Sequence, residues 1–511
     1  MSCCNDSQNK DRVVFWIVLG VQVLALILVC FGVLPRELVL VSSGLVMFYL
    51  IVSPIESGLI LFIASIPIFV AMPISENFDS LSAGRVFVLI LFLKWFFSKK
   101  QIKFKKVEIL SVLLLLVMLL SILPAVDKIT AIKKVIYLVN LVVLVIVVKD
   151  TVKDGVVFKK ISKAILVSGG IVFLIALGQL IFVYFSTIGG FWDWWADHVS
   201  YNFYGENLQQ IVKTNNAWFA SSPSSSSVLR IFGSFTDPHS FSLYLLLIIP
   251  FIFVFAMPLI KNKVREGKIS KQQIFWLVWL ILSMFFIVLS GTRGVWLSVV
   301  FAILASIYLL IKKMNFNRIV SCVVVVVIIF ILLIPIASVF TAIPQFKERN
   351  NNDASLVLKR LASILNLDET SNQGRVYIWK KSLESFKKHP LLGIGVGNFP
   401  VVLEQDIALA KAGSSAHNLY LNFLVENGIF AFILIILIVL EILSTIFSVL
   451  KTNPSPEKRK LITAIFVFLV WIFGYGLFDI ALMDERVFLL FLTILGLIFA
   501  IRRNPKILEN E

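Results

Sequence analysis

The sequence predicts an all-α, polytopic integral membrane protein with about 12–14 transmembrane helices. Of its 511 residues, 59% are hydrophobic and only 15% are charged, whereas soluble domains have roughly 45–50% apolar and about 25% charged residues. The mean hydropathy is +0.94. The apolar residues also fall in long blocks, and a helix needs about 20 such residues to cross a bilayer.

The hydrophobic blocks define the expected spans in chain order. The first follows a charged head, as a signal peptide does, but it is too long and has no small-residue cleavage site, so we interpret it as a span. The blocks 38–53, 85–98 and 131–148 are short, which is why the expected number extends down to 12 or so. The expected spans are 13–34, 38–53, 55–74, 85–98, 107–123, 131–148, 161–187, 239–260, 272–290, 294–311, 319–343, 417–450, 461–479 and 486–502.

The formal net charge of +17 is concentrated in short loops between these spans. Basic residues in short loops mark the cytoplasmic side of a membrane protein. With a cytoplasmic N-terminus every cluster falls on that side, so we expect both termini in the cytoplasm and no nucleic-acid partner. The clusters are Lys99, Lys100, Lys103, Lys105 and Lys106; Lys149, Lys153, Lys159 and Lys160; Lys261, Lys263, Arg265, Lys268 and Lys271; Lys312, Lys313 and Arg318; Lys451, Lys458, Arg459 and Lys460; and Arg502, Arg503 and Lys506.

Two connections are long, and the alternation of spans places both outside the cytoplasm. Long loops in a compact fold are usually functional. They divide the chain into an N-terminal bundle (1–187), a first outer loop (188–238), central helices (239–343), a large outer loop (344–416) and C-terminal helices (417–511).

The first outer loop contains two distinctive stretches. "FWDWWADH" (191–198) is rich in aromatic residues, which favours an aromatic belt at the membrane interface. "SSPSSSS" (221–227) has the composition of a flexible linker.

The large outer loop contains "GRVYIWKKSLESFKK" (374–388). Its apolar residues have helical spacing, with Lys380, Lys381, Glu384 and Lys387 opposite. Such a basic amphipathic helix lies in the interface or closes over a site, and a surface helix packed on the spans is the alternative. The expected apolar face is Val376, Trp379, Leu383 and Phe386.

The next stretch, "HPLLGIGVGNFP" (389–400), has glycine at 393, 395 and 397. A dinucleotide site would need a strand before it and a helix after it in a βαβ unit. We therefore expect these glycines to form a tight backbone turn.

Unusual polar residues gather at the outer level in four places. Arg230, Asp237 and His239 lie in "RIFGSFTDPHSF" (230–241), and Arg293 lies in "SGTRGVW" (290–296). Arg375 opens the amphipathic helix. Arginine outside opposes the usual charge bias, and its planar fork matches phosphate oxygens, so a diphosphate is a natural partner. The alternatives are snorkelling helix-end residues or an ion pair with Asp237.

His417 is the fourth such residue, at the start of "SSAHNLYLNFLVENG" (414–428). Histidine suits proton transfer near neutral pH, and a histidine hydrogen-bonded to backbone at a helix start is the alternative. On a helix, His417, Leu421 and Leu424 would share one face, and Asn418 and Asn422 the neighbouring one.

These motifs resemble those of the bacterial O-antigen ligase family, which also includes O-antigen and capsule polymerases and protein O-oligosaccharyltransferases. The signature is His417 and Asn418 followed by nine residues and Gly428. "GTRG", "GSFTDP" and "RVYIWKKSLESFKKHPLLGIGVGNF" are similar to further family segments, in the family's order. The resemblance covers roughly residues 200–480.

The resemblance implies transfer of a glycan from a polyprenyl (undecaprenyl) diphosphate carrier to an acceptor hydroxyl, at the outer side of the bacterial cytoplasmic membrane and without metal, nucleotide or other cofactor. It implies that Arg230 and Arg293 hold the diphosphate and that His417 is the general base. Asp237, Arg375 and Asn418 are auxiliary candidates. The family often has asparagine where this chain has His239, which makes His239 a second candidate base.

A lipid-linked oligosaccharide flippase is the alternative from another class. It would carry ionisable residues along a route at midplane depth, and here Lys94 and Glu441 are the clearest mid-span charges. That scarcity favours an enzyme. Polymerase and ligase share donor and motifs, and we lean to a polymerase because nothing marks a lipid or protein acceptor site. Other polysaccharide-assembly membrane proteins are expected partners.

Overall fold

A computed structural model describes residues 2–74, 81–98, 106–206, 209–210, 213, 218–222, 225–256, 270–312, 317–341, 343, 370–404, 415–452 and 455–508. The expected all-α, multi-pass architecture is confirmed, and within these residues 8 helices are long and apolar enough to cross a membrane. Every expected span coincides with a helix. These helices are α1 (Ser2–Cys30), α2 (Leu38–Val52), α3 (Ile55–Ser65), α4 (Ala83–Ser98), α5 (Lys106–Leu120), α6 (Lys128–Thr151), α7 (Gly155–Phe185), α11 (Pro238–Ala256), α13 (Lys271–Leu289), α14 (Arg293–Ile311), α15 (Asn317–Thr341), α18 (Leu419–Lys451), α19 (Pro456–Tyr475) and α20 (Glu485–Arg503).

The remaining elements are short apart from one helix, α17 (Thr370–Lys388). The expected span 55–74 is helical only to Ser65, and Pro67 lies in the 3-10 turn that follows. Proline lacks the N–H that a continuing α-helix would use. The short elements are η1 (Ile66–Ile68), β1 (Ala71–Met72), β2 (Leu81–Ser82), α8 (Ile188–Trp194), η3 (Trp195–Ser200), α9 (Tyr201–Tyr204), β3 (Phe219–Ser222), β4 (Ser225–Leu229), η5 (Phe399–Leu403), η6 (Ala481–Met483) and η7 (Pro505–Leu508).

The serine-rich stretch 221–227 was expected to be a flexible linker, and this prediction is wrong. Strands β3 and β4 pair there as an antiparallel hairpin. The end of β4 is fixed because Val228 and Leu229 are buried. Composition indicated a linker, but burial of the adjacent apolar residues decides the conformation.

The aromatic stretch 191–198 is also different from a lipid-facing belt. Trp192 and Trp195 are buried and both pack against Phe232, just after the hairpin. Large aromatic side chains contribute much of a core's buried area. Most of this stretch therefore packs against the segment that follows the β3–β4 hairpin.

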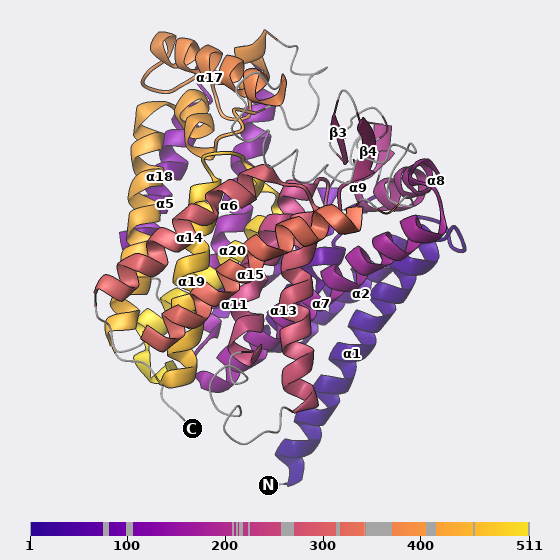
Figure 1. Ribbon diagram of the computed structural model, residues 1–511. Helices are drawn as coiled ribbons and strands as arrows, with labels where there is room; N and C mark the ends of the chain where they lie inside the picture. Colours follow the sequence, from indigo (N-terminus) through magenta and orange to yellow (C-terminus); the bar gives the residue numbers. More distant parts are fainter. Residues whose placement is uncertain are drawn as a thin grey trace.

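The two ends of the helix bundle differ in character. At one end, which we call the basic face, α4, α6, α18 and α20 end, and both chain ends lie on this side in Figure 1. Ion pairs join Lys149 to Glu108 and Arg503 to Asp150. The opposite end, the site face, carries α17 across the top of the bundle and the β3–β4 hairpin (Figure 1). Of the basic clusters, residues 99–105, 261–269 and Lys313 lie outside the described residues.

Helix α17 buries only part of the expected face. Phe386 packs, as expected, against a small core at the start of α18, whereas Val376 and Leu383 are exposed. Ile378 also packs against this core, and Ser382 is buried. The helix is placed by this core, to which Ile394, Phe399 and Val425 contribute. Periodicity located the helix correctly but gave only part of its buried side, because that side is decided by packing against the loop that follows and against α18.

The glycine turn follows α17, as predicted. Gly393, Gly395 and Gly397 all have positive φ, as does Gly428 within α18. Ile394 N donates to Val425 O at 3.1 Å and Ile429 N donates to Pro390 O at 2.9 Å. A Cβ on Gly428 would overlap the Leu391 carbonyl. The turn is therefore pressed against a break in α18, which explains the glycine that closes the histidine motif.

Candidate functional site

The first part of the site is the start of α11. Pro238 opens this helix, a position that suits proline because its missing N–H is not needed there. The Asp237 carboxylate accepts hydrogen bonds from His239 N and Ser240 N, both at 2.8 Å. Asp237 is thus a helix cap that fixes the direction of His239.

Arg230 joins this helix start to the turn before α14. Its Nε donates to Ser290 O at 2.7 Å, and its Nη2 lies 3.4 Å from both Thr292 Oγ1 and His239 Nε2. The residue is only 7% exposed. Burial, as the main cause, and the charge of Arg293 lower the pKa of the Arg230 guanidinium to about 10, although the charge of Asp237 opposes this shift. Arg230 is still cationic at neutral pH.

Asp479 lies between the two histidines. Its Oδ2 is 3.5 Å from Nδ1 of His239 and 3.5 Å from Nδ1 of His417. Burial alone would raise the pKa of Asp479, but His239, His417 and Arg375 together hold it below its usual range. Asp479 can therefore accept a hydrogen bond from Nδ1–H of His417, and it lies equally close to Nδ1 of His239.

The two histidines differ in how far their nitrogens are engaged. His239 Nδ1 also lies 2.7 Å from the Tyr475 hydroxyl and its Nε2 faces Arg230, and its side chain is 23% exposed. The His417 side chain is 41% exposed and meets Asp479 through Nδ1. With the proton on Nδ1, the Nε2 of His417 is the acceptor.

His417 lies just before α18, not in it, so the expected shared face with Leu421 is wrong. Its φ is +44°, a left-handed conformation that non-glycine residues seldom adopt and that tends to occur at functional sites. Asn418 is the N-cap: its Oδ1 accepts from Tyr420 N and Leu421 N. The turn at His417 aims the ring across the helix end toward Asp479.

The amphipathic helix α17 holds the segment before His417. Trp379 Nε1 donates to Ala416 O at 3.0 Å. On the other side, Leu419 N donates to Gly476 O at 2.7 Å. The backbone on both sides of His417 is therefore fixed by remote parts of the chain.

The other predicted residues also lie at the site face. Arg293 is the first residue of α14, close enough to Arg230 to influence its pKa. Arg375 acts on the pKa of Asp479. The structure thus brings Arg230, His239 and His417 together through Asp479, with Arg293 and Arg375 near them, whereas Asp237 and Asn418 are caps.

Sequence reasoning missed Asp479 and Tyr475. Asp479 lies in "GYGLFDIALMDER" (474–486), a short break between two spans. A carboxylate in an otherwise apolar turn between two spans was a usable signal, because ionisable residues beside spans are costly and usually have a partner. Tyr475 ends an ordinary apolar helix, so only the packed structure identifies it.

The comparisons with known proteins agree with the motifs. A family model described as O-antigen ligase matches residues 277–436, which include Arg293, Arg375 and His417 but not Arg230 or Asp479. An uncharacterized protein of Haemophilus influenzae is 27% identical over 196 residues, which are 37% of this chain. The matched segment spans 47% of that relative's length. The chain is a multi-pass membrane protein, and the resemblance is confirmed over 277–436, the segment that the O-antigen ligase family model matches.

Proposed function

We propose that this protein transfers or polymerises oligosaccharide units from a polyprenyl diphosphate carrier onto an acceptor hydroxyl, with His417 as general base. The observation that carries the proposal is the contact of His417 with Asp479, within a cluster that also holds three arginines. In this proposal the site face is the outer side of the bacterial cytoplasmic membrane, and both termini are cytoplasmic.

The reaction needs a base and fixed positive charge. The acceptor oxygen attacks the anomeric carbon, its proton passes to Nε2 of His417, and the bond to the diphosphate breaks with its electron pair on the leaving oxygen. Asp479 stabilises the imidazolium that forms. Charge grows on phosphate oxygens, where Arg293 and Arg375 provide counter-charge. Arg230 is held by its hydrogen bond to Ser290 O and adds a third positive charge to the cluster.

An apolar groove supports a lipid-linked donor. It has a volume of about 640 Å³ and lies between α14, α17, α18 and α19, with Trp379, Asn418 and Tyr420 at the end near the site. Its remaining lining is mainly aliphatic and aromatic. We propose that this groove receives the first isoprene units of the carrier while the diphosphate meets the arginines.

The placement of the mid-span charges supports an enzyme over a transporter. Lys94 donates to backbone carbonyls at Leu50 and Ile51, at the end of α2, and Glu441 pairs with Arg502 and Lys106 at the basic face. Neither lies on a route through the middle of the bundle, where a transporter would need polar groups.

The test uses purified protein in detergent, where no second compartment exists. Labelled polyprenyl-diphosphate oligosaccharide is supplied alone, with a lipid A core acceptor, or with an acceptor protein. We expect release of polyprenyl diphosphate together with a longer glycan when the donor is supplied alone, as a polymerase requires. Product only with the lipid A core would indicate a ligase, and product only with the acceptor protein would indicate an oligosaccharyltransferase. Intact donor in all three mixtures would contradict the proposal.

A further inference from the structure

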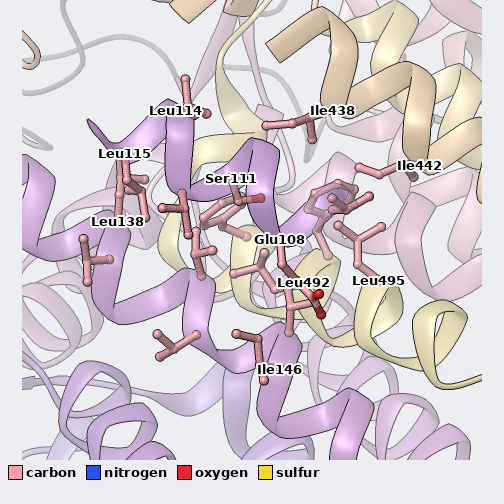
Figure 2. A pocket seen from close by; sticks show the side chains of 18 of the residues that line it. Glu108, Ser111, Leu114, Leu115, Leu138, Ile146, Ile438, Ile442, Leu492 and Leu495 are labelled. Carbon is pink, nitrogen blue, oxygen red and sulfur yellow. The ribbon is translucent and has the colours of Figure 1, made fainter. Parts of the chain in front are cut away.

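A second hollow lies inside the bundle, away from the proposed site. It is a slot of about 340 Å³ between α5, α6, α18 and α20, and Figure 2 shows Leu114, Leu115, Leu138 and Ile438 around it. Protein interiors rarely leave voids much larger than a water molecule. A slot of this size in a protein that sits in lipid therefore has an occupant.

The lining of the slot indicates hydrocarbon as that occupant. Apart from Glu108, Ser111 and the indole of Trp95, its walls are apolar. The end toward the site face is lined by Leu419, Leu482 and Met483. These apolar side chains do not suit a charged headgroup. Such a cavity excludes water, and an alkyl chain regains the missing dispersion contacts.

The other end of the slot is charged. A polar hollow at the basic face shares Val107, Glu108 and Phe499 with the slot and adds Lys106, Lys149 and Arg502. Lys149 is paired with Glu108, whereas Lys106 and Arg502 share the single carboxylate of Glu441 at 3.1 and 3.0 Å. This mouth thus carries one more positive than negative charge.

We propose that the slot binds an anionic membrane phospholipid from the leaflet at the basic face. One acyl chain fills the slot, and the phosphodiester, with its single negative charge, lies at Lys106 and Arg502. Lys106 is 73% exposed and so can meet a headgroup, and basic pockets between spans are typical sites for anionic lipids. The polyprenyl carrier is the competing occupant, but at the end toward the site face the described lining that its diphosphate would meet is Leu419, Leu482 and Met483.

The test reconstitutes the full chain in vesicles of equal phosphatidylglycerol and phosphatidylcholine, then extracts it gently and identifies retained lipid by native mass spectrometry. We expect retained phosphatidylglycerol in preference to phosphatidylcholine. Lys106→Glu should lower this preference by about fivefold or more. Lys312→Glu, which reverses an exposed charge at the end of α14, is the matched control and should leave it unchanged.

A second pair of variants tests the slot itself. Leu115→Trp fills it, while Leu116→Trp adds the same ring to the exposed side of α5. We expect loss of the retained phospholipid in the first variant only. Equal retention of both phospholipids by the wild type, equal retention by the two tryptophan variants, or retained polyprenyl carrier would each overturn the proposal. If Leu115→Trp does not fold, Lys106→Glu decides, since its side chain is mostly exposed.

Discussion

Two groups of charged residues, one at each face of the bundle, are organised differently. Two pairs at the basic face are one-to-one: Lys149 with Glu108, and Arg503 with Asp150. At the site face one carboxylate, Asp479, lies beside two histidines, with three arginines around it. One-to-one pairs hold helix ends together, whereas a cluster of titratable groups that share one carboxylate is typical of a functional site. Variants at the two faces should therefore fail in different ways.

Removing Asp479 should have the largest effect among the partners of the two histidines. Without the carboxylate, His417 loses the group that orients Nδ1 and stabilises the imidazolium, so we expect Asp479→Ala to slow transfer by about 10²–10⁴-fold. Because Asp479 acts through His417, donor binding should change little. Rate and donor affinity are measured on folded protein, and Asp479→Glu should recover part of the rate. If Asp479→Ala weakened donor binding but left the transfer rate unchanged, Asp479 would not act through His417.

Arg293→Lys should lower activity by about 10- to 100-fold. It keeps the charge but removes the planar fork, and a hydrogen bond to a charged group contributes about 1.5–3 kcal/mol. The measurement is the transfer rate at matched protein levels. Lys312→Arg, an exchange at the opposite face, is the control. Full activity of the lysine variant would indicate that Arg293 is a helix-end residue that reaches toward the membrane surface and does not bind the diphosphate.

Lys149→Met should lower stability and leave the transfer activity of the folded protein unchanged. It removes the lysine that pairs with the buried carboxylate of Glu108. Breaking a buried ion pair typically costs about 3–5 kcal/mol of stability, while transfer per folded molecule stays normal. Thermal unfolding in detergent measures the first effect. The double variant Glu108→Gln/Lys149→Met should recover most of the stability, because no buried charge is left unpaired. A large loss of transfer activity per folded molecule in Lys149→Met would contradict a purely structural role for this ion pair.

Gly428→Ala should affect the site through the fold. The residue has φ +78° and lies against the Leu391 carbonyl, so a methyl group there forces the glycine turn and α18 apart. We expect a marked loss of folded protein. Gly178→Ala, in a part of α7 with open space around the glycine, should be neutral or stabilising, since alanine is the better helix former.

Much of the fold follows from local sequence, and less of the site does. The spans could be predicted because about 20 apolar residues in lipid leave a helix as the only satisfied backbone. The full buried side of α17 and the pairing of β3 with β4 could not be predicted, because both depend on tertiary packing. His417, Arg293 and Arg230 were found through their motifs. Asp479 was missed because only the meeting of α11, α18 and the 476–484 turn shows that one carboxylate serves both histidines.

The most direct test of the central claim compares His417→Ala with His239→Ala in the detergent assay, with donor affinity measured for each folded variant. His417 is more exposed and engages one nitrogen with Asp479, whereas both nitrogens of His239 have partners. The account predicts that His417→Ala binds the donor normally but loses transfer by about 10²–10⁴-fold, while His239→Ala still transfers. Transfer by His417→Ala at the wild-type rate, or its loss only in His239→Ala, would contradict it.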